Sequence, residues 1–494
     1  MFLIRAILFF SLLVFCSTSF GQKQDKALFK LYKAANADFE RKDFVNSLKK
    51  YQKIYERDSA NPELNYRIGV CLYNLKESQM QSIKYFEKVS ATEYTESQFY
   101  LGKLYHLSER FNDAIRCYKN YKSISVKNLD NETVDVLISK TMNAIEMKKT
   151  PLNVSIKNLG NTINSKHPDY VPLMSADGSV LIFTSRRNNS TGKLKDMNGE
   201  YMEDIYISHR SGSAWTEPVS ISKNINTDLH DACVALSPDG QQLIIYRTSE
   251  DMMSGDLYLS KYNGKDWSVP EMLGSDINTE DGIEASATFS PDNNMIIFSS
   301  DRSGGYGKRD LYRVVKLPNG EWSKAQNLGN IINTAEDEDA PFLHTNGKTL
   351  YFSSKGHKNM GGYDIFKSEM RDDGTWLEPE NIGYPINTVN DDIYFILSVN
   401  GDKGYFSSIS SVTYGGTDIY SIDIPEQNFG LAVVNAQVSN PNGEPLQASI
   451  SLIEEESNSS IGKYQSSKET GKFICVISPN RKYKLIVQAD SYNS

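Results

Sequence analysis

The stretch Ser290-Pro-Asp-Asn-Asn-Met-Ile-Ile-Phe-Ser-Ser-Asp-Arg-Ser-Gly-Gly-Tyr-Gly-Lys-Arg-Asp-Leu-Tyr312 decides the fold of this 494-residue chain. It begins with a turn in which proline presets φ, aspartate bonds back to the backbone and asparagine takes the unusual dihedral angle. The β-branched and aromatic runs in and around it predict strands at 284–289, 295–299, 310–315 and 321–328. Four strands per unit is the size of a β-propeller blade.

The markers of this unit recur along the chain, and its tryptophans are 52, 55 and 54 residues apart. A repeat of this length, made of short β runs and turns, predicts one supersecondary unit stacked radially or linearly. The markers are Trp215, Trp267, Trp322 and Trp376; the tripeptides that begin at Asp204, Asp256, Asp310, Asp364 and Asp418; and the Ile-Asn pairs that begin at Ile163, Ile225, Ile277, Ile332 and Ile386.

Five such units lie between about residues 153 and 425, and they predict a five-bladed β-propeller. A six-bladed ring would require one blade too degenerate to recognise. The last unit has no tryptophan segment of its own, whereas residues 153–160 resemble that missing piece. We therefore expect residues 153–160 to supply the outer strand of the last blade and close the ring, which removes free sheet edges.

Upstream of the propeller, residues 28–148 are typical of amphipathic helices. In the clearest copy, phased small and aromatic residues predict the packing of two paired helices, as in an α-solenoid of tetratricopeptide repeats. An ordinary helical bundle is the alternative. The residues of this copy are Leu101, Gly102, Tyr105, Ala114, Tyr118 and Tyr121.

The N-terminus has the pattern of a secretory signal peptide. Arg5 precedes an apolar run at 6–15, and small residues stand before a cleavage position at Gln22. Cys16 suggests lipidation, but Phe15 occupies the place where a lipoprotein signal has a small residue. We expect residues 1–21 to be the signal peptide and the protein to reside in the periplasm, associated with the outer membrane. No other segment is apolar enough for a transmembrane helix.

Residues 427–494 lack the blade markers and predict a small β-sandwich, which gives three domains after the signal peptide: 22–149, 150–426 and 427–494. The net charge of −9 disfavours nucleic-acid binding. Of the five cysteines, the four that would remain after signal cleavage are widely spaced, so we expect buried thiols rather than a disulfide framework.

Together these pieces resemble the OmpA-family envelope proteins of Bacteroidota. The turns, the Asp-Ile-Tyr strands and the loops at 304–306 and 361–363 resemble the TolB-type propeller repeat, and residues 443–446 and 471–473 resemble a carboxypeptidase-regulatory-like domain. Members of that family usually continue into an OmpA-like domain that binds peptidoglycan. This sequence holds no such domain, so peptidoglycan binding is not implied; the chain is either a piece of a longer protein or a shortened member.

Catalytic motifs are missing from the sequence. It contains no G-x-S-x-G elbow, no H-E-x-x-H and no phosphate-binding loop, and its turns lack the Thr-Trp ending of a sialidase Asp-box. We expect a protein that is not an enzyme and needs no cofactor or metal.

A carboxylate precedes the turn by the same spacing in every unit, and this position predicts a place near the start of each innermost strand. Convergent carboxylates could ring one mouth of the central channel and bind a cation or a basic partner segment. Alternatively, each could cap its own blade or accept a neighbouring backbone N–H. The five are Asp169, Asp231, Glu284, Glu338 and Asp392.

Two classes of function follow from this organisation. The first is a scaffold that bridges envelope or secretion proteins, with Tyr66, Tyr73, Lys103 and His106 as candidate partner-binding residues on the helical repeats. Ordinary helix packing is the alternative for each of them. The second class is a sensor of a small ligand or glycan at the propeller.

Overall fold

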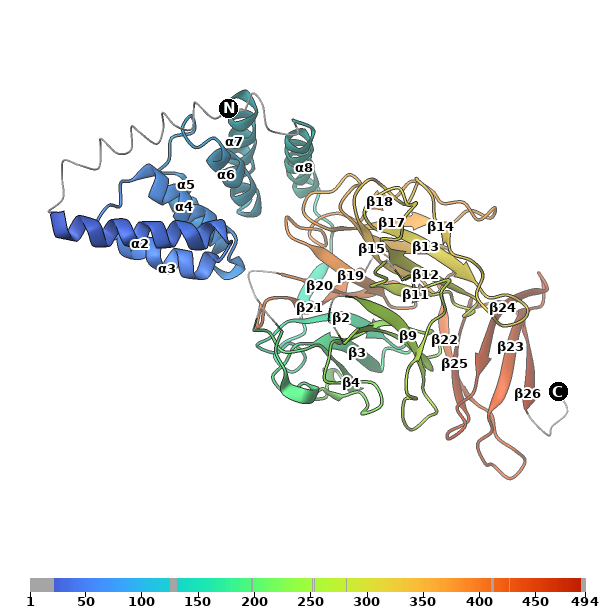
Figure 1. Ribbon diagram of the computed structural model, residues 1–494. Coiled ribbons are helices and arrows are strands. Elements are labelled where there is room, and N and C mark those ends of the chain that lie inside the picture. The colour runs from blue at the N-terminus through green and yellow to red at the C-terminus, as the bar shows by residue number, and fades with distance from the viewer. Residues whose placement is uncertain are drawn as a thin grey trace. The chain divides into compact units, whose positions relative to one another are not determined.

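The computed structural model describes residues 22–124, 131–196, 199–250, 252, 254–280, 282–409, 413–425 and 427–489 (Figure 1). The chain forms two compact units that divide between Met142 and Asn143, the first helical and the second built of β-sheets. The expected signal peptide and Cys16 lie outside the described residues. Among the described helices, none has the length and apolarity that crossing a membrane requires.

The helical unit consists of short helices joined by tight turns. Asp43 and Asn61 cap two of them, because their side chains accept from Asn46 N and Leu64 N, both at 3.1 Å. The elements are α2 (Gln22–Glu40), α3 (Phe44–Tyr55), α4 (Pro62–Tyr73), the 3-10 helix η1 (Lys76–Ser82), α5 (Ile83–Phe86), α6 (Glu96–Leu107), α7 (Phe111–Ile124) and α8 (Asn131–Lys149), which extends beyond Met142.

Glycines let these helices approach one another closely. A Cβ on Gly102 of α6 would lie 2.4 Å from the Tyr118 ring of α7, and a Cβ on Gly69 of α4 would lie 2.7 Å from the Phe86 ring of α5. The six residues of the clearest predicted copy are all buried, and five of them belong to one hydrophobic cluster, with Gly102 beneath the Tyr118 ring. The predicted packing of this helix pair is confirmed.

The second unit contains five sheets arranged as propeller blades, each with a run of antiparallel strands (Figure 1). The first blade is β2 (Asp169–Met174), β3 (Val180–Ser185), β4 (Asp204–Ser211), β5 (Ala214–Trp215) and β6 (Val219–Ser220); the second is β7 (Asp231–Leu236), β8 (Gln242–Thr248), β9 (Gly255–Lys261) and β10 (Glu271–Met272); the third is β11 (Ala287–Phe289), β12 (Met295–Ser300), β13 (Asp310–Val315) and β14 (Gln326–Asn327); the fourth is β15 (Glu338–Leu343), β16 (Thr349–Ser354), β17 (Asp364–Glu369) and β18 (Glu380–Asn381); the fifth is β19 (Asp392–Leu397), β20 (Lys403–Ser408), β21 (Asp418–Asp423) and β1 (Ser155–Asn158).

The ring is closed in two ways. The innermost strands β2, β7, β11, β15 and β19 contact one another in that order, and β19 contacts β2. In the fifth blade, β1 pairs antiparallel with β21 from Ser155 opposite Asp423 to Asn158 opposite Tyr420. The prediction that residues 153–160 complete the last blade is confirmed. Five blades are formed by the described residues, so no sixth blade is needed.

The outer strands are shorter than the predicted 321–328. In the third blade, Trp322 makes only an isolated bridge with Lys316, and β14 holds two residues. The second and fourth blades repeat this arrangement with Trp267 and Trp376. Proline follows these two tryptophans by three residues and has no N–H to donate, but the third blade has Ala325 at this place and the same interruption, so proline alone does not cause it.

The C-terminal residues form two small sheets that share a core. One sheet pairs β22 (Ala432–Gln437) with β25 (Lys472–Ile477), and the other has the order β24 (Ser459–Gln465), β23 (Ala448–Glu454), β26 (Tyr483–Ala489). Ile450, Leu452, Tyr464, Phe473 and Cys475 are buried between them. This is a small β-sandwich.

Candidate functional site

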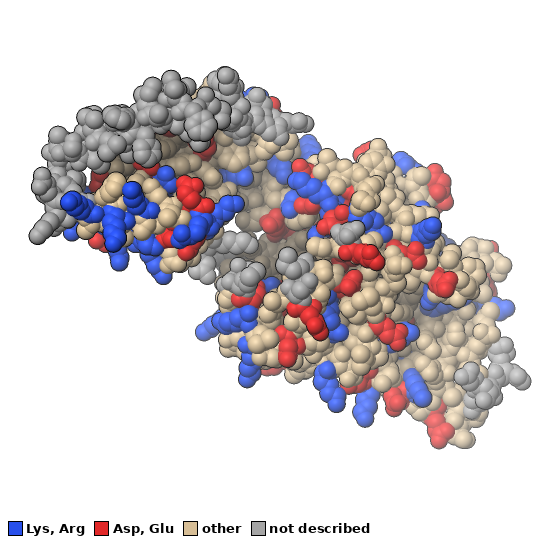
Figure 2. All heavy atoms as spheres, in the orientation of Figure 1, with Lys and Arg blue, Asp and Glu red and all other residues tan. Residues whose placement is uncertain are grey.

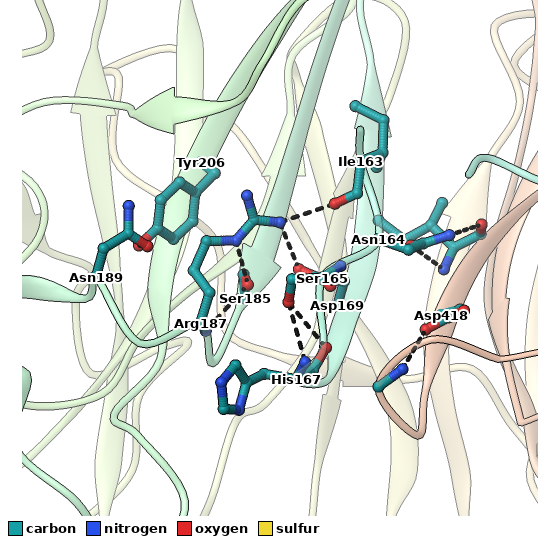
Figure 3. A network of polar contacts seen from close by, with 12 residues as sticks. Ile163, Asn164, Ser165, His167, Asp169, Ser185, Arg187, Asn189, Tyr206 and Asp418 are labelled. Carbon is teal, nitrogen blue, oxygen red and sulfur yellow. Dashed lines mark hydrogen bonds and ion pairs between the residues drawn. The ribbon is translucent and has the colours of Figure 1, made fainter. Parts of the chain in front are cut away.

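The five repeated carboxylates are fully buried at the inner ends of the blades. Figure 3 shows the first of them: Asp169 accepts from Ser165 N at 2.5 Å and from the Arg187 guanidinium at 2.8 Å. The same guanidinium donates to Ile163 O at 2.8 Å, and its centre lies 4.7 Å from the centroid of the Tyr206 ring. Asp169 therefore fixes the turn that leads into its own blade.

The other four carboxylates make the same contact with the threonine of the Ile-Asn-Thr motif. Thr227, Thr279, Thr334 and Thr388 donate backbone N–H groups to Asp231, Glu284, Glu338 and Asp392 over 2.6, 3.1, 2.7 and 2.6 Å. The prediction that these five line an open channel mouth is corrected, because all five have no exposed surface. They serve their own blades, as the alternative interpretation held.

The cationic partner of these carboxylates changes around the ring. Arg187, Arg247 and Arg302 pair with those of the first three blades. In the fourth blade a ring nitrogen of His357 lies 2.8 Å from Ile332 O, the equivalent of the carbonyl to which the arginines of the first three blades donate. Burial raises the pKa of Asp231 and of Glu338, and it raises the pKa of Asp392 to about 8.

The asparagine of the same motif joins neighbouring blades. Asn333 accepts from Leu311 N at 2.8 Å and donates to Leu311 O at 3.0 Å. Its side chain therefore satisfies the backbone of Leu311 in the preceding blade, as a neighbouring strand would. Asn164 makes both contacts with Ile419 across the closure point. The repeated polar residues thus hold the ring together, and their hydrogen-bonding capacity is used for that purpose.

The aspartates that begin the third strands hold the glycine-rich loops. Asp310 accepts from Tyr306 N at 2.6 Å and Gly307 N at 3.0 Å, and Asp418 accepts from Tyr414 N at 2.8 Å. These loops leave Tyr306 56% and Tyr414 50% exposed. They present aromatic rings to solvent on a rigid support.

Polar residues that do not follow the repeat gather where the innermost strands begin. In the first blade, Arg186 binds Asp196 at 2.7 Å and Glu203 at 3.3 Å, and Tyr170 donates to Glu203. The ring of His230 lies 3.1 Å from the same carboxylate. Although burial opposes it, the pKa of Glu203 is held below its ordinary value by hydrogen bonding to His230 and by the charge of Arg186.

A second ion pair at this place joins the third and fourth blades. Arg309 donates to Asp339 at 2.7 Å, and Asp339 also accepts from Ser286 of the neighbouring blade. The Nε of Arg309 is buried and has no hydrogen-bond partner among the described residues. Arg309 therefore retains an unused donor.

Two tyrosines, Tyr246 of the second blade and Tyr394 of the fifth, also belong to this group of polar residues. The charges of Glu203 and Arg309 both act on the pKa values of Tyr246 and Tyr394, which burial raises. Tyr394 has a φ of 60°, in the left-handed region, and lines the axial cavity. We call the set Tyr170, Arg186, Glu203, His230, Tyr246, Arg309, Asp339 and Tyr394 the channel-mouth cluster.

The axial cavity beside this cluster is small and lined mainly by apolar side chains. It measures about 90 Å³ and lies between innermost strands, with Val171, Ala235, Phe289 and Ile396 on its walls. Nowhere in the described ranges do three His, Cys, Asp or Glu side chains converge as a metal site would require. Figure 2 shows acidic and basic side chains interspersed over the face that it presents.

The four candidate partner-binding residues lie in the helical unit with different exposure. Tyr66 stacks on Tyr94 with ring centroids 5.0 Å apart, and Tyr73 lies 4.7 Å from Tyr100; both candidates are half-buried. Lys103 is also half-buried. His106 is buried, and its Nδ1 lies 2.9 Å from Thr141 Oγ1. Three of the four therefore reach solvent, whereas His106 contacts α8.

Comparisons with known proteins return only remote likenesses. No protein-family model and no curated protein matches the chain. Prolyl oligopeptidase B from Galerina marginata is 8% identical with a TM-score of 0.29, over 57% of this chain and 38% of its own. Endo-arabinase from Bacteroides thetaiotaomicron is 14% identical with a TM-score of 0.36, over 54% and 98%. The gluconolactonase XC5397 from Xanthomonas campestris is 10% identical with a TM-score of 0.32, over 56% and 91%.

The chain spans less than two fifths of the prolyl oligopeptidase, and it matches the other two proteins over nearly their whole length. Matches this remote carry no conclusion about activity.

Sequence reasoning missed the channel-mouth cluster because it followed the residues that repeat. The cluster consists of residues that break the repeat: Glu203 and Arg309 stand directly before the repeated aspartates Asp204 and Asp310, where the second blade has Gly255 before Asp256. In a ring of similar blades, a residue that recurs in every blade usually stabilises the blade itself. A polar residue that occurs in one blade only is not required for that purpose and is a better candidate for function. A comparison of the five units for the positions at which they differ could have identified the channel-mouth cluster from the sequence.

Proposed function

We propose that this protein is a non-catalytic scaffold of the cell envelope that binds other proteins through its helical unit and its propeller. The observation that carries the proposal is an aromatic surface on α4, α6 and the turn between α5 and α6. We define this surface by Tyr66, Tyr73, Tyr94, Phe99, Tyr100 and Lys103, all half-buried. No described residue hydrogen-bonds to the hydroxyls of its four tyrosines. Half-buried aromatic groups with free polar ends are typical of protein-binding surfaces.

The helical pairs support assignment as tetratricopeptide repeats, because Gly69 with Phe86 and Gly102 with Tyr118 make the same contact in successive pairs. Such repeats bury one face against the next pair and leave the other face for partners. With the resemblance to OmpA-family envelope proteins and the signal-peptide pattern, this supports a periplasmic location beside the outer membrane. The partners we propose are envelope or secretion proteins.

The propeller supports a binding role rather than catalysis. Its repeated carboxylates are fully buried and hydrogen-bonded within their own blades, which places them away from any substrate in solution. The exposed rings of Tyr306 and Tyr414 supply a second surface on rigid loops. Two binding units in one chain favour bridging of two partners.

The experiment is affinity purification of the tagged protein from crosslinked envelopes. We expect defined envelope proteins to be recovered, and fewer of them with a Tyr73→Ser/Tyr100→Ser variant. Tyr55→Ser on α3 is the matched control, since it removes a half-buried tyrosine of the helical unit that lies outside the aromatic surface. Circular dichroism verifies that the variants fold. If wild type and both variants recover no protein, the scaffold proposal fails.

A second candidate function is binding of a small ligand at the channel-mouth cluster. The observation that favours it is the buried Nε of Arg309, which has no hydrogen-bond partner among the described residues, in a guanidinium whose charge acts on the pKa values of Tyr246 and Tyr394. Thermal shift with a panel of sugars and organic acids tests it on the purified chain. A stabilising compound should lose its effect with Arg309→Met and keep it with Arg313→Met on β13, which begins directly after Arg309. No stabilisation by any compound would reject this function.

A further inference from the structure

The aromatic surface of the helical unit contains a cation that no described carboxylate neutralises. The ammonium group of Lys103 lies 4.7 Å from the centroid of the Phe99 ring. It forms no ion pair within the described part of the chain. On α4, by contrast, Arg67 has an ion-pair partner, because it binds Glu63 at 3.1 Å. Lys103 is thus a half-buried positive charge that has no ion-pair partner among the described residues.

The surroundings of Lys103 are apolar on the protein side. Phe99 precedes it by one helical turn and contacts Tyr121 with ring centroids 5.3 Å apart. Burial lowers the pKa of Lys103, and no neighbouring acid opposes this shift. A charge held in such a place favours any arrangement that brings a carboxylate to it.

The aromatic rings form a continuous series of contacts that ends at Lys103. Tyr94 stacks on Tyr66, Tyr66 meets Phe86 at 6.1 Å, and Phe86 stacks on Tyr100 at 5.0 Å. Tyr100 then meets Phe99, over which Lys103 lies. Phe86 is fully buried in the middle of the series, so the half-buried rings on either side of it present the apolar area, and Lys103 adds one positive charge at the end.

We propose that this surface binds a partner protein segment that carries apolar side chains and an acidic residue, with the carboxylate paired to Lys103. The inference rests on the proposed scaffold function and specifies the chemistry of its partner. Charge complementarity selects the acidic residue, and the aromatic series selects the apolar side chains. A basic segment would place a like charge against Lys103.

The experiment measures fluorescence anisotropy of labelled synthetic peptides with the purified full chain. Three peptides share the same phenylalanine and leucine positions and carry glutamate, glutamine or lysine between them. We expect the glutamate peptide to bind most tightly. Lys103→Met should weaken its binding by about tenfold, the size of one lost charge-assisted hydrogen bond. Lys53→Met on α3 is the matched control and should bind as wild type does.

The charge reversal Lys103→Glu gives a second, independent readout. It should bind the lysine peptide more tightly than the glutamate peptide, which a misfolded variant cannot do. Equal binding of the three peptides by wild type, or unchanged binding by Lys103→Met, overturns the inference. Envelope partners that are recovered equally with wild type and Lys103→Met would leave the scaffold standing and reject only the acidic segment.

Discussion

Asp169 and Asp392 occupy the same position in the first and fifth blades, but their partners differ. Asp169 accepts from Arg187 at 2.8 Å, whereas Asp392 accepts from the hydroxyls of Thr388 and Ser408 and from Thr388 N and forms no ion pair within the described ranges. Both carboxyl groups are fully buried. The same position in the repeat is therefore paired with a cation in the first blade and hydrogen-bonded only to neutral groups in the fifth.

The first prediction concerns the pH dependence of stability that Asp392 causes. Its pKa is raised from 3.8 to about 8 by burial. Between these values the native state keeps a proton that the unfolded state has released, so stability falls as pH rises. The slope approaches 1.4 kcal/mol per pH unit for one group. Asp392→Asn should flatten this dependence in thermal melts between about pH 5 and 9.

Asp169→Asn is the control for that measurement. It leaves the buried guanidinium of Arg187 without its carboxylate partner, so the melting temperature should fall at every pH. Parallel pH profiles for wild type and Asp392→Asn would contradict the raised pKa.

The second prediction concerns the asparagines that join the blades. Asn333→Ala leaves Leu311 N and Leu311 O buried without their partners. Each unsatisfied backbone group costs about 1 to 3 kcal/mol. Chemical denaturation of the propeller should therefore show a loss of several kcal/mol, whereas Asn319→Ala in an exposed turn should change stability by less than about 0.5 kcal/mol. Equal stability of the two variants would contradict the joining role.

The third prediction concerns the glycine under Tyr118. Gly102→Ala would place a methyl group 2.4 Å from the ring, so α6 and α7 would have to separate. We expect a loss of about 1 to 3 kcal/mol despite the better helix propensity of alanine. Replacing the ring with a smaller side chain, by adding Tyr118→Leu to Gly102→Ala, should restore part of the lost stability. A more stable Gly102→Ala would show that the two helices pack elsewhere.

The fourth prediction concerns the thiols. The four cysteines within the described residues are free and buried, as the sequence predicted, and burial raises the pKa of Cys233 to about 12 and of Cys71 and Cys117 to about 11. Little thiolate exists near neutral pH. Maleimide should label the native protein slowly at pH 8 and all four thiols after unfolding in guanidinium. Rapid labelling of the native chain would contradict this.

Much of the ring could be predicted from the sequence because its physical demands repeat. The Ile-Asn-Thr motif and the aspartate of each third strand recur because every blade needs the same turn and the same loop support. The closing strand was found because residues 153–160 resemble an outer strand, and Asn158 indeed donates to Asp418 at 2.7 Å.

Other features leave no repeated trace in the sequence. Val171, Ala340 and Tyr394 take φ values of 52°, 48° and 60° at equivalent places in three innermost strands, although none is a glycine. Their register shifts come from packing around the axis, which no local pattern records. The channel-mouth cluster was missed for the same reason, because residues from five blades meet only after the ring has closed.

The closure by β1 also decides how the propeller responds to pulling. The chain comes into the ring through Ser155 and leaves it after Asp423, and these two residues are opposite each other at one end of the β1–β21 pair. Tension applied through the two flanking segments would pull the β1–β21 pair apart from this end. Its hydrogen bonds would break one after another rather than all together, as they would if the strands were pulled in opposite directions along their length. The contacts of Leu152 with Tyr384 and of Phe429 with Asn400, each a 2.8 Å backbone hydrogen bond, would have to break first. The fifth blade is thus the part of the propeller on which such tension acts first.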